Sequence, residues 1–142
     1  MLNLTEEQKT RLKVVAEKYS LKFVVAHGSY ATGKEHKGSD LDIAVLGIKE
    51  IPFHKQLELR GDLANIFGDN ETRELDLKEL NNTDALFRYL VVRDGALLYG
   101  NNADYEEFKA YARRDFELSK DLFDLEELLI KKQNKLLRRA YA

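Results

Sequence analysis

Residues 27–47, HGSYATGKEHKGSDLDIAVLG, decide how the rest of the chain is interpreted. The segment starts with a Gly-Ser pair behind the apolar, β-branched run of residues 21–26. It closes with a second apolar run, headed by Asp40 and Asp42. Side chains alternate across a strand, so the two aspartates project from one face. Like charges repel, and a buried carboxylate is costly unless it is neutralised. We therefore expect this pair to hold a positive charge.

The positive charge that suits two neighbouring carboxylates is a hard divalent cation, which takes oxygen ligands. A third carboxylate commonly completes such a site. The later run RELDL offers Glu74 and Asp76, which share one face of a strand. The alternative is that the Asp-x-Asp pattern is the solvated face of an edge strand, and the pattern taken alone favours that alternative.

The Gly-Ser pair changes this balance. Gly28 lets backbone N–H groups approach an anion closely, and the Ser29 hydroxyl adds a donor for phosphate oxygens. A helix that begins at Ser29 would add a partial positive charge. Phosphate on one side and Mg²⁺ on the other is the layout of a nucleoside triphosphate site.

Helical and strand periodicities alternate along the rest of the chain. Thr5, followed by two glutamates, predicts the start of a first helix, and Pro52 suits the first turn of another. Asp104 and Glu107 suggest the cap of the last helix. We expect strands at 21–26, 40–47, 71–77 and 96–100, and helices after Thr5, at 52–67, from Asn82 or Thr83 to 93, and at 102–139.

The composition is that of an ordinary globular protein. The 142 residues are 44% hydrophobic and 34% charged, enough for one domain with a real core. A net charge of −2 gives no reason to expect direct binding to nucleic acid or to an anionic membrane. The absence of cysteine excludes disulfides and thiolate metal sites. The N-terminus has no signal-peptide pattern, so we expect a cytoplasmic protein. We also expect a single domain, in which a core, 1–100, carries a helical arm, 101–142.

The spacing from Gly28-Ser29 across ten residues to Asp40-x-Asp42 is similar to the signature of the polymerase-β-like nucleotidyltransferase superfamily. The fuller pattern, G-S-x-A-x-G followed by S-D-x-D, resembles the minimal nucleotidyltransferases (MNT). Residues 74–100 resemble the strand, helix and turn that follow in that family, so the likeness covers most of the chain. The resemblance implies an α/β (α+β) fold, in which a small mixed sheet is flanked by helices and followed by a long C-terminal helix.

The resemblance also implies a role for each site residue. Gly28 and Ser29 would hold the β- and γ-phosphates of ATP. Asp40, Asp42 and Asp76 would ligate Mg²⁺, expected as two ions. The reaction is then nucleotidyl transfer, in which a hydroxyl attacks the α-phosphate and pyrophosphate leaves.

Two positions qualify this assignment. Asp76 would position and deprotonate the attacking hydroxyl, with Glu74 as the reserve candidate because it shares the face. Thr32 stands where these proteins often carry Arg. The missing positive charge would change the phosphate contact and leave the metal ligands intact.

Small MNT proteins resemble the antitoxins that prokaryotes encode beside HEPN-domain ribonuclease toxins. The resemblance implies that this chain forms a complex with such a toxin and transfers AMP from ATP to one of its tyrosines. The added anion would block RNA by repulsion and occlusion. Two alternatives stay open: an antitoxin that inhibits by docking alone, and an enzyme that adenylylates a small aminoglycoside-like alcohol.

The last helix and one histidine complete the expectations. An apolar series runs from Phe108 to Leu136, and a second row includes Phe116 and Phe123. Either part of this helix docks the toxin, or both rows are buried within the monomer. His27, beside the Gly-Ser pair, is expected to make a local hydrogen bond rather than to contact a phosphate.

Overall fold

The two apolar runs that flank the Gly-Ser segment form the centre of a four-stranded sheet. Strands β1 (Leu21–His27) and β2 (Leu41–Gly47) pair antiparallel. Strand β4 (Ala96–Gly100) pairs antiparallel with β1, whereas β3 (Leu75–Glu79) runs parallel to β2. The order β3-β2-β1-β4 gives the small mixed sheet that the resemblance implies.

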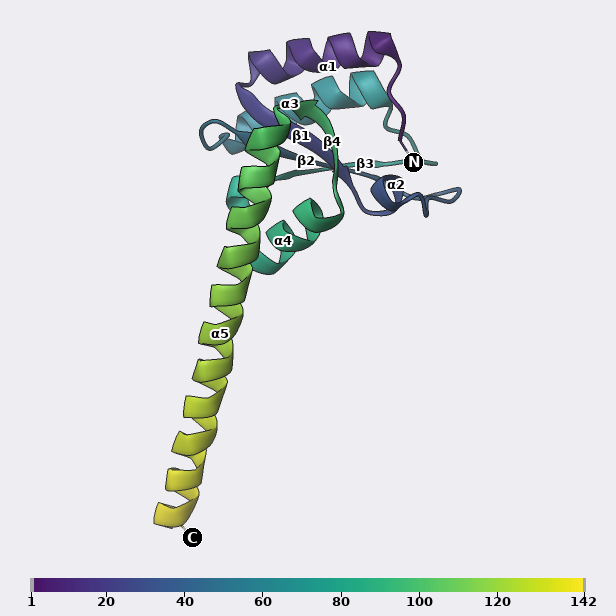
Figure 1. Cartoon of the computed structure of the whole chain (residues 1–142). Coiled ribbons are helices and arrows are strands. Elements are labelled where there is room, and N and C mark those ends of the chain that lie inside the picture. Colours follow the sequence, from purple (N-terminus) through teal and green to yellow (C-terminus); the bar gives the residue numbers. More distant parts are fainter. Residues whose placement is uncertain (1, 142) are drawn as a thin grey trace.

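Helices cover both faces of this sheet in the computed structural model, which describes residues 2–141 (Figure 1). Helices α1 (Glu6–Lys18) and α3 (Phe53–Phe67) lie on one face. Helix α4 (Ala85–Asp94) and the first turns of α5 (Asn102–Tyr141) lie on the other. Two short elements connect strands to helices: α2 (Ser29–Thr32) and the 3₁₀ segment η1 (Leu80–Asn82). Within residues 2–141, none of the helices has the length and apolar character to cross a membrane.

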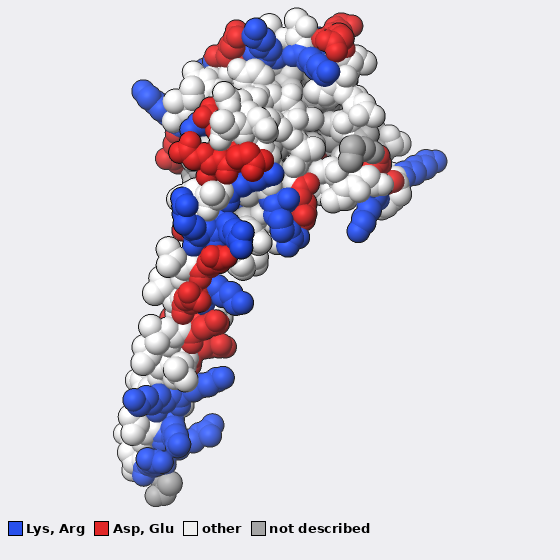
Figure 2. All heavy atoms as spheres, viewed as in Figure 1, with Lys and Arg blue, Asp and Glu red and all other residues white. Residues whose placement is uncertain are grey.

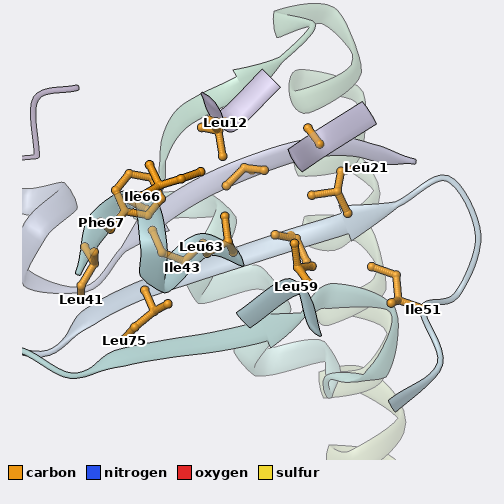
Figure 3. Packing of buried hydrophobic residues seen from close by; sticks show 14 residues of the cluster. Leu12, Leu21, Leu41, Ile43, Ile51, Leu59, Leu63, Ile66, Phe67 and Leu75 are labelled. Atoms are coloured by element: carbon orange, nitrogen blue, oxygen red, sulfur yellow. The ribbon is translucent and has the colours of Figure 1, made fainter. Parts of the chain in front are cut away.

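The larger core cluster lies between the sheet and helices α1 and α3 (Figure 3). Leu41 and Ile43 of β2 and Leu75 of β3 point toward Leu59 and Leu63 of α3. All five side chains are nearly inaccessible to solvent. Strand alternation therefore turns Asp42 and Asp76, the intervening residues, to the opposite face.

The smaller cluster lies on that opposite face. Phe23 of β1 makes edge-to-face ring contacts with Tyr105 and Phe108 of α5, both with centroids 5.3 Å apart. The Tyr105 hydroxyl donates to the carbonyl oxygens of Val92 and Gly95 at 3.0 and 3.1 Å. These contacts fix α4 and the start of α5 against the face that carries the aspartates.

The helix termini confirm one expected cap and correct two. Thr5 caps α1, as predicted, and the structure adds that Thr5 and Gln8 form a capping box. Asp84, not Asn82 or Thr83, caps α4, because its carboxylate accepts from the Phe87 N–H at 2.8 Å. The predicted Asp104–Glu107 cap of α5 is wrong, because the Asn101 side chain accepts from the Ala103 N–H at 2.7 Å. Strands β2 and β3 also begin later than expected, at Leu41 and Leu75.

Helix α5 changes character along its length. Near the core, Arg88 of α4 pairs with Asp115 at 3.5 Å, and Tyr89 stacks on Phe116 with centroids 4.8 Å apart. Residues 117–141 are exposed throughout and project away from the sheet; we call them the arm (Figure 1). Of the two alternatives for this helix, burial of both apolar rows within the monomer is wrong: Phe116 is half-buried, and Phe123 lies in solvent.

Candidate active site

Three side chains from adjacent strands stand side by side at one end of the sheet. The β1–β2 register places His27 opposite Asp42, and the β2–β3 register places Asp42 opposite Asp76. We call these three residues the strand row. Alternation puts the row on the face that α4 and α5 partly cover, next to Val25 and Ala44 of the smaller cluster.

Asp42 is the member of the row whose charge is least compensated. Burial raises the pKa of Asp42, and the negative charges of Asp76 and Asp40 raise it further, while Lys78 acts in the opposite sense. Lys78 itself pairs with Asp76 at 3.8 Å. Within residues 2–141, Asp42 has neither an ion pair nor a side-chain hydrogen bond. A bound cation would relieve this repulsion.

Asp40 and Glu74 lie at the edge of the row rather than within it. Both precede their strands, and both are exposed. The Leu41 N–H donates to the carbonyl oxygen of Glu74 at 2.8 Å, so the backbone segments that lead into β2 and β3 are hydrogen-bonded to each other. The register therefore favours Asp76 over Glu74 as the neighbour of Asp42.

The donor set fits Mg²⁺ in chemistry. Asp40, Asp42 and Asp76 offer only carboxylate oxygens, which hard divalent ions prefer. Their mutual repulsion is the electrostatic condition that a cation would reverse. The described residues, 2–141, contain no group of three His, Cys, Asp or Glu side chains already gathered closely enough to hold an ion.

The Gly-Ser turn comes directly against Asp42. Gly28 has φ 68° and ψ −150°, a conformation that side chains rarely adopt. A Cβ at this position would also lie only 2.4 Å from Oδ2 of Asp42. Glycine is therefore needed both for the turn and for the space. The half-buried Ser29 follows as the first residue of α2.

A surface cleft of about 380 Å³ extends from this turn toward α4. Thr32 lines it, but the Thr32 hydroxyl turns back to the carbonyl oxygens of Gly28 and Ser29 at 3.4 and 3.5 Å. The cation of the cleft comes instead from Arg93, which forms two hydrogen bonds with Asp94 at 3.2 and 2.7 Å. Arg93 of α4 therefore places a positive charge in this cleft, but that charge is paired with Asp94.

His27 is the site residue that sequence reasoning set aside. The expected local hydrogen bond is absent within residues 2–141: Nε2 is buried and has no partner. The ring packs edge-on against Phe87, with centroids 5.8 Å apart. Burial lowers the pKa of His27; Asp76 opposes this shift, and Lys78 adds to it. The signal that could have found it is its place at the end of β1, directly before Gly28.

Known proteins with solved structures share this fold over nearly their whole length. A crystal structure of a toxin–antitoxin with AMP-PNP contains a chain that superposes with a TM-score of 0.67 at 24% identity, covering 87% of this chain and 96% of that one. An MNT antitoxin in complex with the tri-AMPylated HEPN toxin of Shewanella oneidensis superposes with a TM-score of 0.62 at 21% identity, covering 89% and 96%. These likenesses establish the fold.

Sequence comparison leads to the same group of proteins. The protein adenylyltransferase MntA of Aphanizomenon flos-aquae is 28% identical over 144 residues, which cover 96% of this chain and 93% of that protein. MntA of Shewanella oneidensis is 32% identical over 88 residues, covering 62% and 60%. The family model described as polymerase beta, nucleotidyltransferase, matches residues 10–104, which contain the Gly-Ser turn and the whole strand row. This chain belongs to the polymerase β nucleotidyltransferase family.

Proposed function

We propose that this protein is an antitoxin that transfers AMP from ATP to a tyrosine hydroxyl of a HEPN-domain toxin. The observation that carries the proposal is the strand register that sets Asp76 beside Asp42, with the Gly28 turn against the same carboxylate. Similarity to a protein adenylyltransferase along 96% of the chain supports a protein acceptor. The toxin–antitoxin complexes among the structural relatives support the HEPN partner.

Different residues of the chain would bind the triphosphate and activate the tyrosine hydroxyl. Gly28 and Ser29 would hold the β- and γ-phosphates through backbone N–H groups and the hydroxyl. Asp76 would accept the proton of the tyrosine hydroxyl as its oxygen bonds to the α-phosphorus. The bond from that phosphorus to the bridging oxygen breaks, and pyrophosphate leaves with the electron pair. The products are a toxin tyrosine that carries AMP on its hydroxyl oxygen, as a phosphodiester, and pyrophosphate.

The same carboxylates would hold the metal. Asp40, Asp42 and Asp76 would bind Mg²⁺, proposed as two ions, which would neutralise the phosphates and stabilise charge on the attacking and leaving oxygens. Asp42 is suited to this role because it already carries uncompensated charge beside the phosphate-binding turn. Positioning and charge neutralisation then supply most of the catalysis.

The partner surface stays a prediction. Of the two phenylalanines proposed for toxin docking, Phe116 stacks on Tyr89 and belongs to the monomer. Phe123 is exposed on the arm and remains available to a partner. The reaction is proposed for the cytoplasm, where ATP and a ribonuclease toxin meet.

Two differently labelled ATP samples test the reaction class. The chain is incubated with Mg²⁺, a purified HEPN toxin and ATP labelled at either the α- or the γ-phosphate, and the toxin is examined by electrophoresis and mass spectrometry. We expect α-label, and no γ-label, on a toxin tyrosine, and none when EDTA is present. A toxin that binds and is silenced without gaining label would overturn transfer in favour of inhibition by docking.

A further inference from the structure

The arm exposes an apolar seam that the monomer leaves uncovered. Its 25-residue span, 117–141, extends about 37 Å at 1.5 Å per residue. Leu118, Leu122, Leu125, Leu129 and Leu136 are each more than half exposed. Leucines placed this regularly in solvent indicate a surface that another helix covers.

The spacing of the seam is that of a coiled coil. Its positions advance by alternating steps of four and three residues, from Leu118 to Leu136, with Lys132 occupying one step. A 3.5-residue repeat presents its a and d positions to one partner helix. The other exposed apolar residues of the arm lie beside this seam: Phe123, Leu128, Ile130 and Leu137. Leu122, Leu129 and Leu136 thus take the a positions of a heptad, and Leu118, Leu125 and Lys132 the d positions.

Charge is divided between the two halves of the arm. Figure 2 shows acidic side chains gathered on the part nearer the core and basic side chains toward the far end. The acidic half contains Glu117, Asp121, Asp124, Glu126 and Glu127. The basic half contains Lys131, Lys132, Lys135, Arg138 and Arg139. Two such arms side by side attract when they run antiparallel and repel when they run parallel.

We propose that the arm pairs with the arm of a second copy of this chain as an antiparallel two-stranded coiled coil. In the register that pairs a with d positions, Leu125 meets Leu129 of the second copy and Leu118 meets Leu136. At the flanking g positions, Asp121 lies beside Lys135 of the second copy, and the twofold axis repeats the pair. The two nucleotidyltransferase cores then lie at opposite ends of the paired arms.

Lys132 distinguishes this arrangement from its parallel counterpart. In the antiparallel register Lys132 lies opposite Leu122, where its aliphatic stem can pack while the ammonium group reaches water. In a parallel register Lys132 would face its own copy inside the seam. A single polar residue in a seam commonly fixes the orientation of a coiled coil at some cost in stability.

Charge reversal tests the pairing on the chain alone, without ATP or toxin, so that its outcome is independent of the proposed activity. The mass in solution is measured by sedimentation equilibrium, with circular dichroism as the check on folding. We expect a dimer for the natural chain, and about tenfold weaker association for either Asp121→Lys or Lys135→Asp. Mixing these two variants should restore association, because opposite charges then meet at both pairs. Phe123→Ser, outside the seam, is the matched control and should dimerise normally.

Cross-linking tests the orientation. The natural chain has no cysteine, so Ser119→Cys and Gln133→Cys introduce single thiols at e positions that meet in the antiparallel register. Their mixture should form the mixed disulfide in preference to either symmetric one. Overturning results are a natural chain that stays monomeric, charge variants whose mixture gains nothing, or a seam variant, Leu125→Asp, that loses only its binding to the HEPN toxin.

Discussion

The strand row and the arm are the two regions where this chain departs from ordinary burial, and they depart in opposite senses. The row brings carboxylates together on a partly covered face, and Asp42 forms no ion pair with the residues that the structure describes, 2–141. The arm leaves leucines in solvent. Both arrangements carry a cost in the isolated chain, and each indicates by its chemistry what would relieve it. Repelling carboxylates indicate a cation, and a heptad-spaced apolar seam indicates a helix.

The largest expected effect comes from shortening a leucine of the core and comparing the result with the same change in the arm. Leu63 of α3 is fully buried, whereas Leu137 of the arm is about half exposed and lies outside the seam. Leu63→Ala should lower the free energy of unfolding by about 2–5 kcal/mol, because it leaves a cavity. Leu137→Ala should change it by less than about 0.5 kcal/mol. Urea titration measures both, and equal losses would mean that the arm is part of the folded core.

The next largest effect concerns the two glycines that flank α2. Gly28 and Gly33 both have positive φ, but only a Cβ at Gly28 would collide with Asp42. Each Gly→Ala change should cost about 1–3 kcal/mol of stability from backbone strain. Gly28→Ala should in addition lower AMP transfer about 100-fold, because it displaces a carboxylate of the row.

Gly33→Ala is the matched control for this experiment, since nothing lies within 4 Å of a Cβ there. Its transfer rate should stay near that of the natural chain once folding is confirmed. Equal loss of activity in both variants would mean that backbone strain alone, and not the contact with Asp42, limits the reaction.

The smallest effects contrast Asp42 with an ordinary surface carboxylate. The hydrogen bond from Tyr19 lowers the pKa of Asp62, with Lys18 acting in the same sense, whereas burial and like charges raise the pKa of Asp42. A lowered pKa stabilises the fold above the ordinary value of 3.8, and this contribution is lost as the pH falls through the folded pKa. A raised pKa gives the reverse: its contribution is present at low pH and lost as the pH rises through the folded pKa.

At pH 7 in EDTA, Asp62→Asn should therefore destabilise the chain and Asp42→Asn should stabilise it, each by less than about 1 kcal/mol. Both differences should shrink as the pH approaches 3. Thermal melts at the two pH values measure them. Destabilisation by Asp42→Asn at pH 7 would contradict the picture of repelling carboxylates.

Local patterns in the sequence predict much of the fold. They do not decide which of several adjacent residues caps a helix. The N-cap at Thr5 was predictable because one good N-cap residue precedes one good helix. Asn82, Thr83 and Asp84 are all good N-cap residues, so local chemistry cannot choose among them. The choice is made by Glu79, whose carboxylate accepts from Asn81 and Asn82 and holds both residues in η1. The Thr83 hydroxyl donates to the carbonyl oxygen of Leu80, so Asp84 is the residue that caps α4.

The candidate site was predictable where strand alternation decides it and unpredictable where tertiary contacts do. Asp42 and Asp76 follow from alternation and spacing, and the register then sets them side by side. The burial of His27 depends on Phe87, which helix α4 brings from sixty residues along the chain. The exposure of the arm was equally hidden, because the same heptad spacing occurs in helices that a core covers and in coiled coils.

The central claim is that Asp76, opposite Asp42 on the neighbouring strand, activates the tyrosine hydroxyl. The most direct test is the steady-state rate of AMP transfer to the toxin by Asp76→Asn, with Glu74→Gln as the matched control on the same edge of the sheet. We predict that Asp76→Asn lowers kcat at least about 100-fold and changes the KM for ATP much less, because the lost interaction belongs to the transition state. Glu74→Gln should keep most of the activity. A Glu74→Gln variant more damaged than Asp76→Asn would contradict the account.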